Sequence, residues 1–160
     1  MSTTPSLYLA GGLFNAGERL HNLYLEKHLR NLGYVTILPQ REALKFFSEG
    51  RFDIAGIVAD CMQSCANPAN LYVGNSDGAD SDSGTAVEYG IAITATRAVI
   101  VYRTDFRTAL ENELGVNAMM RAEGTKLIYE PCFFTELDQV DAYYANLAQK
   151  IHLAVNEILR

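Results

Sequence analysis

The sequence lacks a long apolar run and a cluster of basic residues. A helix that crosses a membrane needs roughly 18 or more predominantly apolar residues, and no window of this chain provides them. Lysine and arginine together number 13 against 19 acidic residues, which gives a formal net charge of −6. Because a protein that binds a nucleic-acid polymer needs a basic stripe to neutralise phosphates, we expect neither a membrane nor nucleic acid as a partner.

Cysteine is scarce, with Cys61, Cys65 and Cys132 as the three examples. An odd number cannot all pair, and the absence of a C-x-x-C motif or a Cys/His cluster argues against a metal site. Residues 1–6 are polar and do not form the basic, apolar and cleavage-site pattern of a secretory signal. We therefore predict free thiols, a cytoplasmic location and no metal or other cofactor. The spacing of Cys61 and Cys65 would place both on one helical face.

Strand patterns and helix patterns alternate along the chain, and 49% of the residues are hydrophobic, enough for a sizeable core. Gly33 provides a normal helix end. The predicted strands are 7–10, 34–38, 70–73, 98–102 and 126–129, and the predicted helices are 18–32, 52–65, 85–96 and 135–159. This alternation predicts one α/β domain over residues 1–160, flavodoxin-like or Rossmann-like, with a five-stranded parallel sheet covered by helices on both faces.

Ligands of such open sheets bind beyond the carboxyl ends of the strands. In this chain that edge is formed by four segments, 11–15, 39–41, 75–84 and 103–121. We expect the functional residues to lie in these segments and in the helices that begin next to them.

The densest polar cluster runs from Asp77 to Gly90, where a loop turns into a helix. Its spacing does not fit a calcium-binding EF-hand. An ordinary loop whose Asp and Ser residues cap the helix would account for Asp82 or Ser83. It does not account for Glu88, which lies one turn into an otherwise apolar helix. A buried carboxylate is costly unless it has partners or takes part in chemistry, so catalysis, capping and an ion pair all remain open for Glu88.

A second cluster, Tyr8 to Asn15, follows the first predicted strand. Gly11 and Gly12 allow the backbone to approach a ligand closely. The segment is neither a Walker loop nor G-x-G-x-x-G, so a tight turn and a ligand-binding loop remain equally open. The Tyr8 hydroxyl, at the end of a strand, could reach a carboxylate on a neighbouring element.

Taken together, three motifs resemble the nucleoside 2-deoxyribosyltransferase family. They are Y-L-A-G-x-L-F-N at residues 8–15, D-S-G-T-A-x-E-x-G at residues 82–90, and Asn-x-Met at residues 117–119. The resemblance extends over roughly residues 7–129, with the motifs in the family's order and spacing.

The resemblance implies three catalytic residues. Glu88 corresponds to the nucleophilic glutamate, and Tyr8 to a tyrosine that orients it by hydrogen bonding. The family also places an aspartate on the second helix as a proton donor to the base. Asp60 is the candidate for this role, with Asp53 as a weaker alternative.

The resemblance also implies the substrate-binding residues. Phe14 packs against the base or sugar, Gln40 contacts the base and Asp82 binds the 5′-hydroxyl of the sugar. Gly11 and Gly84 belong to the same two motifs and would allow close approach of the ligand. Asn117 and Met119 would complete the site of an adjoining subunit, which requires a homo-oligomer, at least a dimer and possibly a tetramer or hexamer.

The implied activity is exchange of the purine or pyrimidine base of 2′-deoxynucleosides through a covalent deoxyribosyl-Glu88 intermediate, with retention of the β-anomer. Its partners would be deoxynucleosides and free nucleobases. A carboxylate at position 82 repels phosphate, so free nucleosides are favoured over 5′-monophosphates. Two alternatives stay open: an N-glycosidase that hydrolyses deoxynucleosides or their 5′-monophosphates, and a non-catalytic nucleotide-sensing module.

Two departures from the family are visible. Some relatives end in an aromatic residue that enters a neighbouring site, whereas this chain ends in a predicted helix. Residues 63–70 lack the aspartate that usually precedes the third strand. His21, His28 and His152 are expected in packing or surface roles rather than in catalysis.

Overall fold

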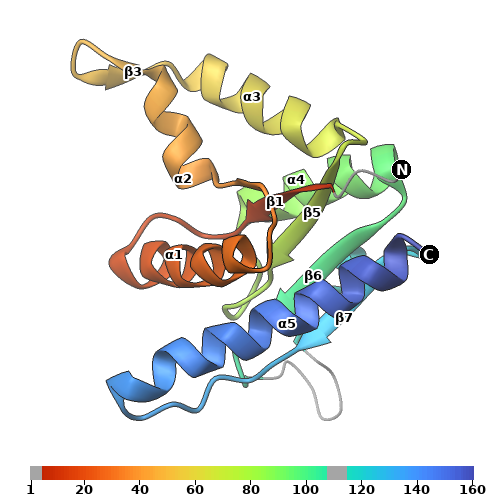
Figure 1. Ribbon diagram of the computed structural model, residues 1–160. Helices are drawn as coiled ribbons and strands as arrows, with labels where there is room; N and C mark the ends of the chain where they lie inside the picture. The colour runs from red at the N-terminus through yellow and green to blue at the C-terminus, as the bar shows by residue number, and fades with distance from the viewer. Residues whose placement is uncertain (1–4, 108–114) are drawn as a thin grey trace.

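The computed structural model of the chain describes residues 5–107 and 115–160, and its main feature is a five-stranded parallel sheet (Figure 1). The strand order is β2-β1-β5-β6-β7, and each pair of neighbours is parallel. The strands are β1 Ser6–Ala10, β2 Thr36–Ile37, β5 Asn70–Asn75, β6 Val99–Arg103 and β7 Thr125–Tyr129. The fold is α/β and flavodoxin-like, which confirms the predicted class and the predicted five strands.

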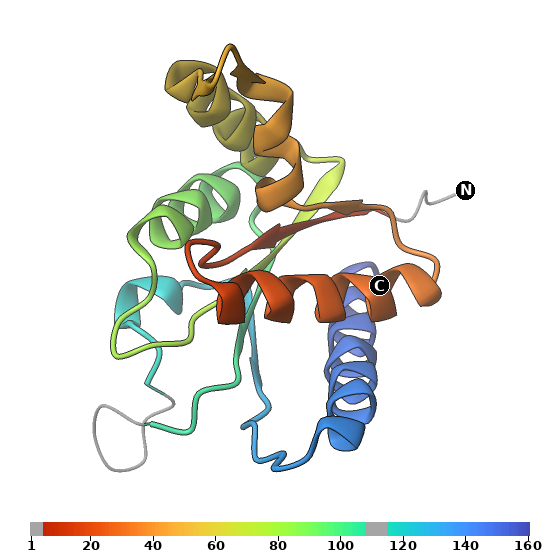
Figure 2. The same cartoon turned by 90° about the vertical axis from the view of Figure 1, so that its left-hand side faces the viewer.

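Helices cover both faces of this sheet (Figures 1 and 2). The helices α1 (Ala16–Asn31) and α5 (Val140–Ile158) pack on one face, and α3 (Ile54–Ala66) and α4 (Ser83–Thr96) pack on the other. Side chains of a strand alternate between the two faces. Leu7 and Leu9 of β1 therefore enter the core beneath α1 and α5, whereas Tyr8 enters the core beneath α3 and α4.

Side-chain caps fix where α1, α3 and α4 begin. Asn15 caps α1 and forms a capping box with Glu18, and Asp53 caps α3 through the Gly56 amide. Asp82 caps α4 through the Thr85 amide. Such caps satisfy backbone N–H groups that have no partner inside the helix. At the other end of α1, Gly33 adopts a φ of 90°, the left-handed conformation expected for a glycine after a helix.

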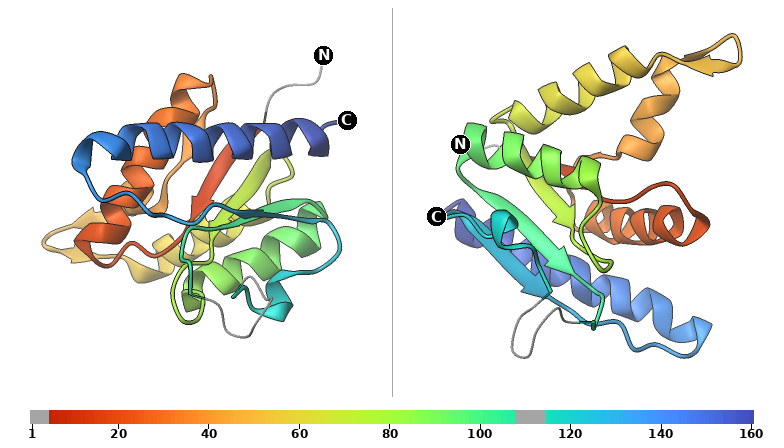
Figure 3. Two further views of the ribbon diagram at one scale, coloured as in Figure 1. Left: turned by 90° about the horizontal axis from the view of Figure 1, so that it is seen from below. Right: turned by 180° about the vertical axis from the view of Figure 1, so that it is seen from behind.

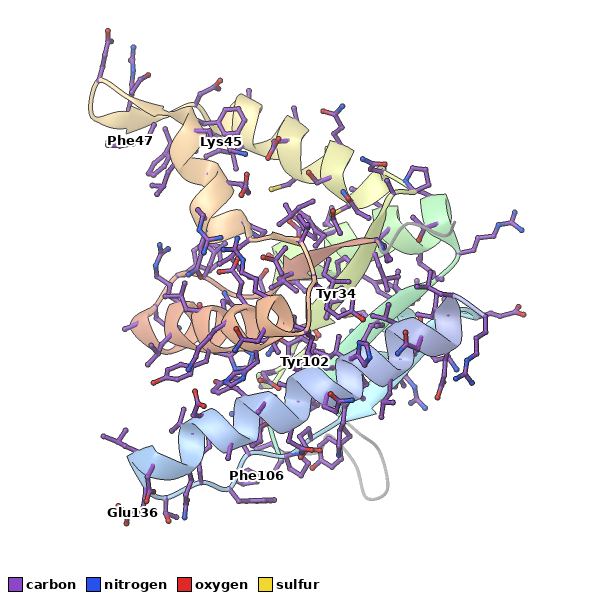
Figure 4. All side chains as sticks on the ribbon, in the orientation of Figure 1. Tyr34, Lys45, Phe47, Tyr102, Phe106 and Glu136 are labelled. Atoms are coloured by element: carbon purple, nitrogen blue, oxygen red, sulfur yellow. The ribbon has the colours of Figure 1, made fainter. Side chains whose placement is uncertain are left out.

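An arm between β2 and α3 was not predicted from the sequence. It consists of α2 (Pro39–Glu42), the 3₁₀ helix η1 (Ala43–Phe46) and a hairpin of β3 (Phe47–Ser48) and β4 (Arg51–Phe52). Figure 4 shows Lys45 and Phe47 on this arm, away from the sheet. Strands of two residues are too short to show alternation, and the turn residues Glu49 and Gly50, both with positive φ, are not a standard hairpin signal.

Smaller differences concern element boundaries. The predicted second strand, 34–38, is reduced to Thr36–Ile37. The predicted helix from 135 begins only at Val140, after the 3₁₀ helix η3 (Leu137–Gln139). The segment after β6 contains the 3₁₀ helix η2 (Ala118–Met120), while residues 108–114 of that predicted edge segment lie outside the described residues. Among the described helices, none is both long enough and apolar enough to cross a bilayer.

Candidate active site

Glu88 and Tyr8, far apart in the sequence, meet on the α3/α4 face of the sheet. Tyr8 lies in β1 with 1% of its surface exposed. Its hydroxyl donates a hydrogen bond to Oε1 of Glu88 at 2.8 Å. Figure 3 shows α3 and α4 on this face of the sheet. Glu88 of α4 is partly buried there.

The surroundings of Glu88 shift its protonation. Burial raises the pKa of Glu88 above its ordinary value, the hydrogen bond from Tyr8 opposes this, the nearby charge of Asp82 raises the pKa further, and the Cys61 thiol acts to lower it. Within residues 5–107 and 115–160, no cation is among the groups that shift this pKa. Burial and the Glu88 charge raise the pKa of Tyr8 well above its usual range, so Tyr8 keeps its proton and acts as a donor. Glu88 is therefore a sheltered carboxylate held by hydrogen bonding rather than by an ion pair.

Asp82 has a structural role that the residues alone had left open. Its Oδ2 accepts hydrogen bonds from the Thr85 amide at 2.9 Å and from the Thr85 hydroxyl at 3.0 Å. Gly84 leaves room for this cap, because a Cβ atom there would lie 3.2 Å from the same oxygen. Asp82 thus starts the helix that carries Glu88 and acts on the Glu88 charge at the same time.

The face of α3 toward Glu88 presents thiols. Cys65 is buried in the core cluster that also contains Tyr8. Cys61, one turn earlier, is partly buried and acts to lower the pKa of Glu88. The spacing of the two cysteines predicted a shared helical face, but no function was predicted for either thiol. The spacing was the available signal, but the element they face could not be identified without the fold.

Asp60 lies beside this cluster rather than against Glu88. Its side chain is partly buried, and its charge acts on Cys61 and on Lys45 of the arm. Asp60 is absent from the groups that shift the pKa of Glu88. The alternative, Asp53, caps α3 by accepting from the Gly56 amide at 3.1 Å, and its side chain is exposed.

The loop after β1 is shaped by contacts within the chain. Gly11 permits close approach of β5, because a Cβ atom at this position would lie 3.1 Å from Cβ of Asn75. Glu18 accepts a hydrogen bond from the Phe14 amide at 2.7 Å and so holds the loop against α1. Phe14 is 79% exposed, so its side chain is accessible to a ligand or another subunit.

Gln40, expected to contact the base, is buried at the start of α2. Its Oε1 accepts from Nδ2 of Asn22 at 3.0 Å, and its Nε2 donates to the Arg19 carbonyl at 3.3 Å. Both ends of this amide therefore connect α2 to α1. A base would have to use the second N–H or the second lone pair of the amide, or displace one of these hydrogen bonds.

Asn117 and Met119 lie on the other side of α4 from Glu88. The Asn117 side chain caps η2 by accepting from the Met119 amide at 3.0 Å, and Met119 is 82% exposed. Together with Ala86 and Gly90 they line a pocket of about 580 Å³. Residues two positions apart on a helix point in nearly opposite directions, so Ala86 and Gly90 face away from the Glu88 side. The structure does not bring Asn117 and Met119 to Glu88 of the same chain.

The histidines have partners outside this cluster. His21 contacts the hydroxyls of Tyr102 and Tyr144, each at 2.9 Å, and burial lowers its pKa (Figure 4 marks Tyr102). His28 pairs with Asp141 at 3.1 Å, and His152 contacts the Tyr34 hydroxyl at 2.7 Å. Within residues 5–107 and 115–160, no group of three or more His, Cys, Asp or Glu is arranged to hold a metal ion.

Two solved structures share this fold. One is described as a conserved protein from Enterococcus faecalis V583, with a TM-score of 0.66 and 20% identity, covering 94% of this chain and 99% of that chain. The other is a 2-deoxyribosyltransferase from Bacillus psychrosaccharolyticus, with a TM-score of 0.62 and 21% identity, covering 89% of this chain and 95% of that chain. At these identities the similarity shows the fold. Comparison with curated protein sequences gives no match.

The match to a protein-family model shows more than the fold. The model of the family described as nucleoside 2-deoxyribosyltransferase matches residues 7–127, from β1 to β7. This range includes Tyr8, Asp82, Glu88 and the Asn-x-Met segment. The chain therefore belongs to the nucleoside 2-deoxyribosyltransferase family.

Proposed function

We propose that this protein exchanges the purine or pyrimidine base of 2′-deoxynucleosides, with Glu88 as a covalent nucleophile. The observation that carries the proposal is the partly buried Glu88 carboxylate, which accepts a hydrogen bond from Tyr8 and has, within the described residues, no cation among the groups that shift its pKa. A structural glutamate in a core is normally paired with a positive charge. An unneutralised carboxylate is instead suited to meet the positive charge that develops on a sugar.

In the first step, a carboxylate oxygen of Glu88 forms a bond to the anomeric carbon while the C1′–N bond breaks and the base leaves with a proton. The configuration at the carbon is inverted. In the second step, a nitrogen of another base attacks the same carbon, loses its proton and releases Glu88 as a carboxylate. The second inversion restores the β-anomer.

Tyr8 and Asp60 have separate roles in this scheme. Tyr8 donates to the ionised form of Glu88 and so favours the state that can attack. Asp60 is the proposed acid that gives the departing base its proton and takes one from the incoming base. The support for Asp60 is its partly buried position on α3, the helix that packs against α4, which carries Glu88. Gln40 and Phe14 are the proposed contacts to the base, and Gly11 and Gly84 allow its approach.

Asp82 favours free nucleosides over 5′-monophosphates. Both of its hydrogen bonds in the cap fall on Oδ2, so Oδ1 is the atom proposed to accept the 5′-hydroxyl proton. A phosphate at the same place would meet a negative charge at short range.

We further propose a homo-oligomer, at least a dimer, in which Asn117 and Met119 complete the site of a neighbouring subunit. Their position across α4 from Glu88 supports this arrangement, because they cannot act on the sugar at Glu88 of their own chain without crossing the helix. Met119, 82% exposed, has the accessibility such a contact requires.

The deciding experiment mixes deoxyinosine with free adenine and follows the products by chromatography. Base exchange predicts deoxyadenosine and hypoxanthine. Hypoxanthine with free deoxyribose would instead identify an N-glycosidase, and binding of the nucleoside without turnover would identify a sensing module. Intact-mass measurement of the quenched enzyme should show an added deoxyribosyl group that is absent from Glu88→Gln.

A further inference from the structure

Two buried amides connect three segments at the carboxyl edge of the sheet. Nδ2 of Asn22, on α1, donates to the Gly12 carbonyl at 3.0 Å and to Oε1 of Gln40 at 3.0 Å. Nε2 of Gln40, at the start of α2, donates to the Arg19 carbonyl at 3.3 Å. Asn22 and Gln40 are each 7% exposed. These hydrogen bonds therefore join the loop after β1, the helix α1 and the helix α2.

The two backbone carbonyls fix the direction of these hydrogen bonds. A carbonyl can only accept, so the Asn22 atom that faces Gly12 must be the nitrogen. For the same reason, Gln40 must turn its nitrogen toward the Arg19 carbonyl. Oε1 of Gln40 then faces the second hydrogen of the Asn22 amide. Reversing either amide would place an oxygen against a backbone carbonyl, so both orientations are held.

Asn22 lies at the point of the sheet where this fold is expected to bind a ligand. The chain passes from β1 to β2 on one side of β1 and later returns to β5 on the other side, so the strand order reverses between β1 and β5. Ligands of open parallel sheets bind beyond the carboxyl ends of the strands at such a point. Here a pocket of about 190 Å³ is lined by Asn22 together with Gly12, which follows β1, and Asn75, which ends β5. The Asn22 amide therefore belongs to the edge where a ligand would bind.

A fixed amide distinguishes bases that differ in one polar group. Gln40 uses one N–H group for Arg19 and one lone pair for Asn22, which leaves one further N–H and one further lone pair. A ligand therefore meets a donor at one end of this amide and an acceptor at the other, in an order that cannot be reversed. Adenine has an amino donor where hypoxanthine has an oxo acceptor. A fixed amide favours one of these bases, whereas an amide that turns freely can pair with both.

We propose that Asn22 is a positioning residue that sets the base preference of this site by fixing the Gln40 amide. The preference rests on the proposed function, in which Gln40 contacts the base. The hydrogen bond between the two amides does not rest on it, so the two can be tested separately.

The first test compares crystal structures of the wild type and of Asn22→Leu, and it does not require activity. Leucine has the branching of asparagine but no polar group. The Gln40 side chain should keep its hydrogen bond to the Arg19 carbonyl in the wild type. In Asn22→Leu it should move away or occupy several conformations, because its oxygen has lost the donor that held it. If Asn22→Leu does not fold, Asn22→Ala provides the same comparison.

The second test is base exchange with deoxyguanosine as the common donor and adenine or hypoxanthine as the acceptor. The wild type should prefer one acceptor, and in Asn22→Leu the ratio of the two kcat/KM values should move toward unity by about 2- to 10-fold, the effect of one neutral hydrogen bond. The change should lie in KM, with kcat within about twofold of the wild type, because contacts to the base act on binding. In Gln40→Leu, adding Asn22→Leu should change the ratio no further, since Asn22 acts through Gln40.

Asn156→Leu is the matched control, because this asparagine lies on α5, where its Nδ2 contacts His152 at 3.0 Å, and it should keep the wild-type ratio. A Gln40 side chain that stays in place in Asn22→Leu would overturn the proposal, and so would an unchanged acceptor ratio or a wild type without a preference. A wild type without base exchange would refute the proposed function, while the crystal structures would still decide whether Asn22 fixes Gln40.

Discussion

The junction of α1 with α2 and the junction of α3 with α4 each contain a sheltered glutamate, and they treat it in opposite ways. Glu26 of α1 is 3% exposed and is bound through both oxygens by Arg41, with Nη1 at 2.6 Å from Oε1. Burial works to raise the pKa of Glu26, but hydrogen bonds from Arg41 and Thr36 outweigh it and the pKa is lowered. At Glu88 burial prevails, and the pKa is raised.

The difference separates a structural carboxylate from a reactive one. The paired Glu26 is stable as an anion, and its oxygens are already occupied by donors. Glu88 has only neutral hydrogen-bond partners, so its anion is less stabilised and more basic. The same residue type therefore acts as a connection between helices at one junction and is available for bond formation at the other.

The largest effects should come from exchanging each glutamate for its amide. Glu88→Gln should reduce base exchange by at least about 10³-fold, because an amide cannot form the glycosyl ester, and should leave the fold intact. Glu26→Gln should leave activity near wild type but lower the free energy of unfolding by roughly 1–3 kcal/mol, since Arg41 loses its partner but remains partly in water. Steady-state kinetics and urea unfolding measure the two effects. If Glu88→Gln lost stability but retained activity, Glu88 would be a structural carboxylate, and its contrast with Glu26 would be wrong.

The two glutamates should also give opposite pH dependences of stability. Glu26, with a lowered pKa, stabilises the fold above its ordinary pKa, and this contribution is lost as the pH falls toward the lowered value. Glu88, with a raised pKa, binds a proton more tightly in the folded state, so stability declines as the pH rises from the ordinary to the raised value. Urea unfolding of each Gln variant across acidic pH should remove one of these trends and keep the other.

Tyr8→Phe should have the next largest effect. A hydrogen bond to a charged group is removed, so kcat should fall by about 10- to 100-fold and the acidic limb of the activity profile should move to higher pH. Tyr72→Phe is the matched control, because this buried hydroxyl donates to the Thr85 carbonyl at 3.0 Å rather than to Glu88. Equal losses in the two variants would show that Tyr8 acts through packing alone.

Asp82→Asn should change specificity by a smaller factor. An amide can still accept from Thr85 and cap α4, but it no longer repels phosphate. The ratio of kcat/KM for a deoxynucleoside 5′-monophosphate over the free nucleoside should rise on the order of tenfold. The pKa of Glu88 should fall because a nearby negative charge is removed, so the acidic limb should move to lower pH. An unchanged ratio would assign Asp82 to capping only.

The smallest predicted signal is the base-exchange activity restored when two inactive variants are combined in one oligomer. Glu88→Gln is co-expressed with the double variant Asn117→Ala, Met119→Ala. If each site combines residues of two subunits, hybrid dimers contain one intact site, and activity should reach about a quarter of the wild-type value. If the two residues act within their own chain, the hybrids should show no activity beyond that of the separate variants.

The sequence was sufficient for the order of the elements, because runs such as Leu7 to Ala10 and the apolar helix around Glu88 carry clear periodicity. It also singled out Glu88, since a lone carboxylate on an apolar helix is unusual. The arm with β3 and β4 could not be predicted, because its strands are too short to carry a pattern. The packing of Cys65 with Tyr8 and Tyr89 in one core cluster depends on how α3 and α4 lie on the sheet, which no local pattern records. The engagement of Gln40 by Asn22 was hidden for the same reason.

The cap at Asp82 also fixes the number of residues that must separate Asp82 from Glu88. Asp82 fixes the rotational phase of α4 about its own axis, and each residue along a helix turns the next by about 100°. One inserted residue between Asp82 and Glu88 would swing the carboxylate by that angle and away from β1. Side chains within this segment can be exchanged, but its length is set by the rotation per residue of the helix.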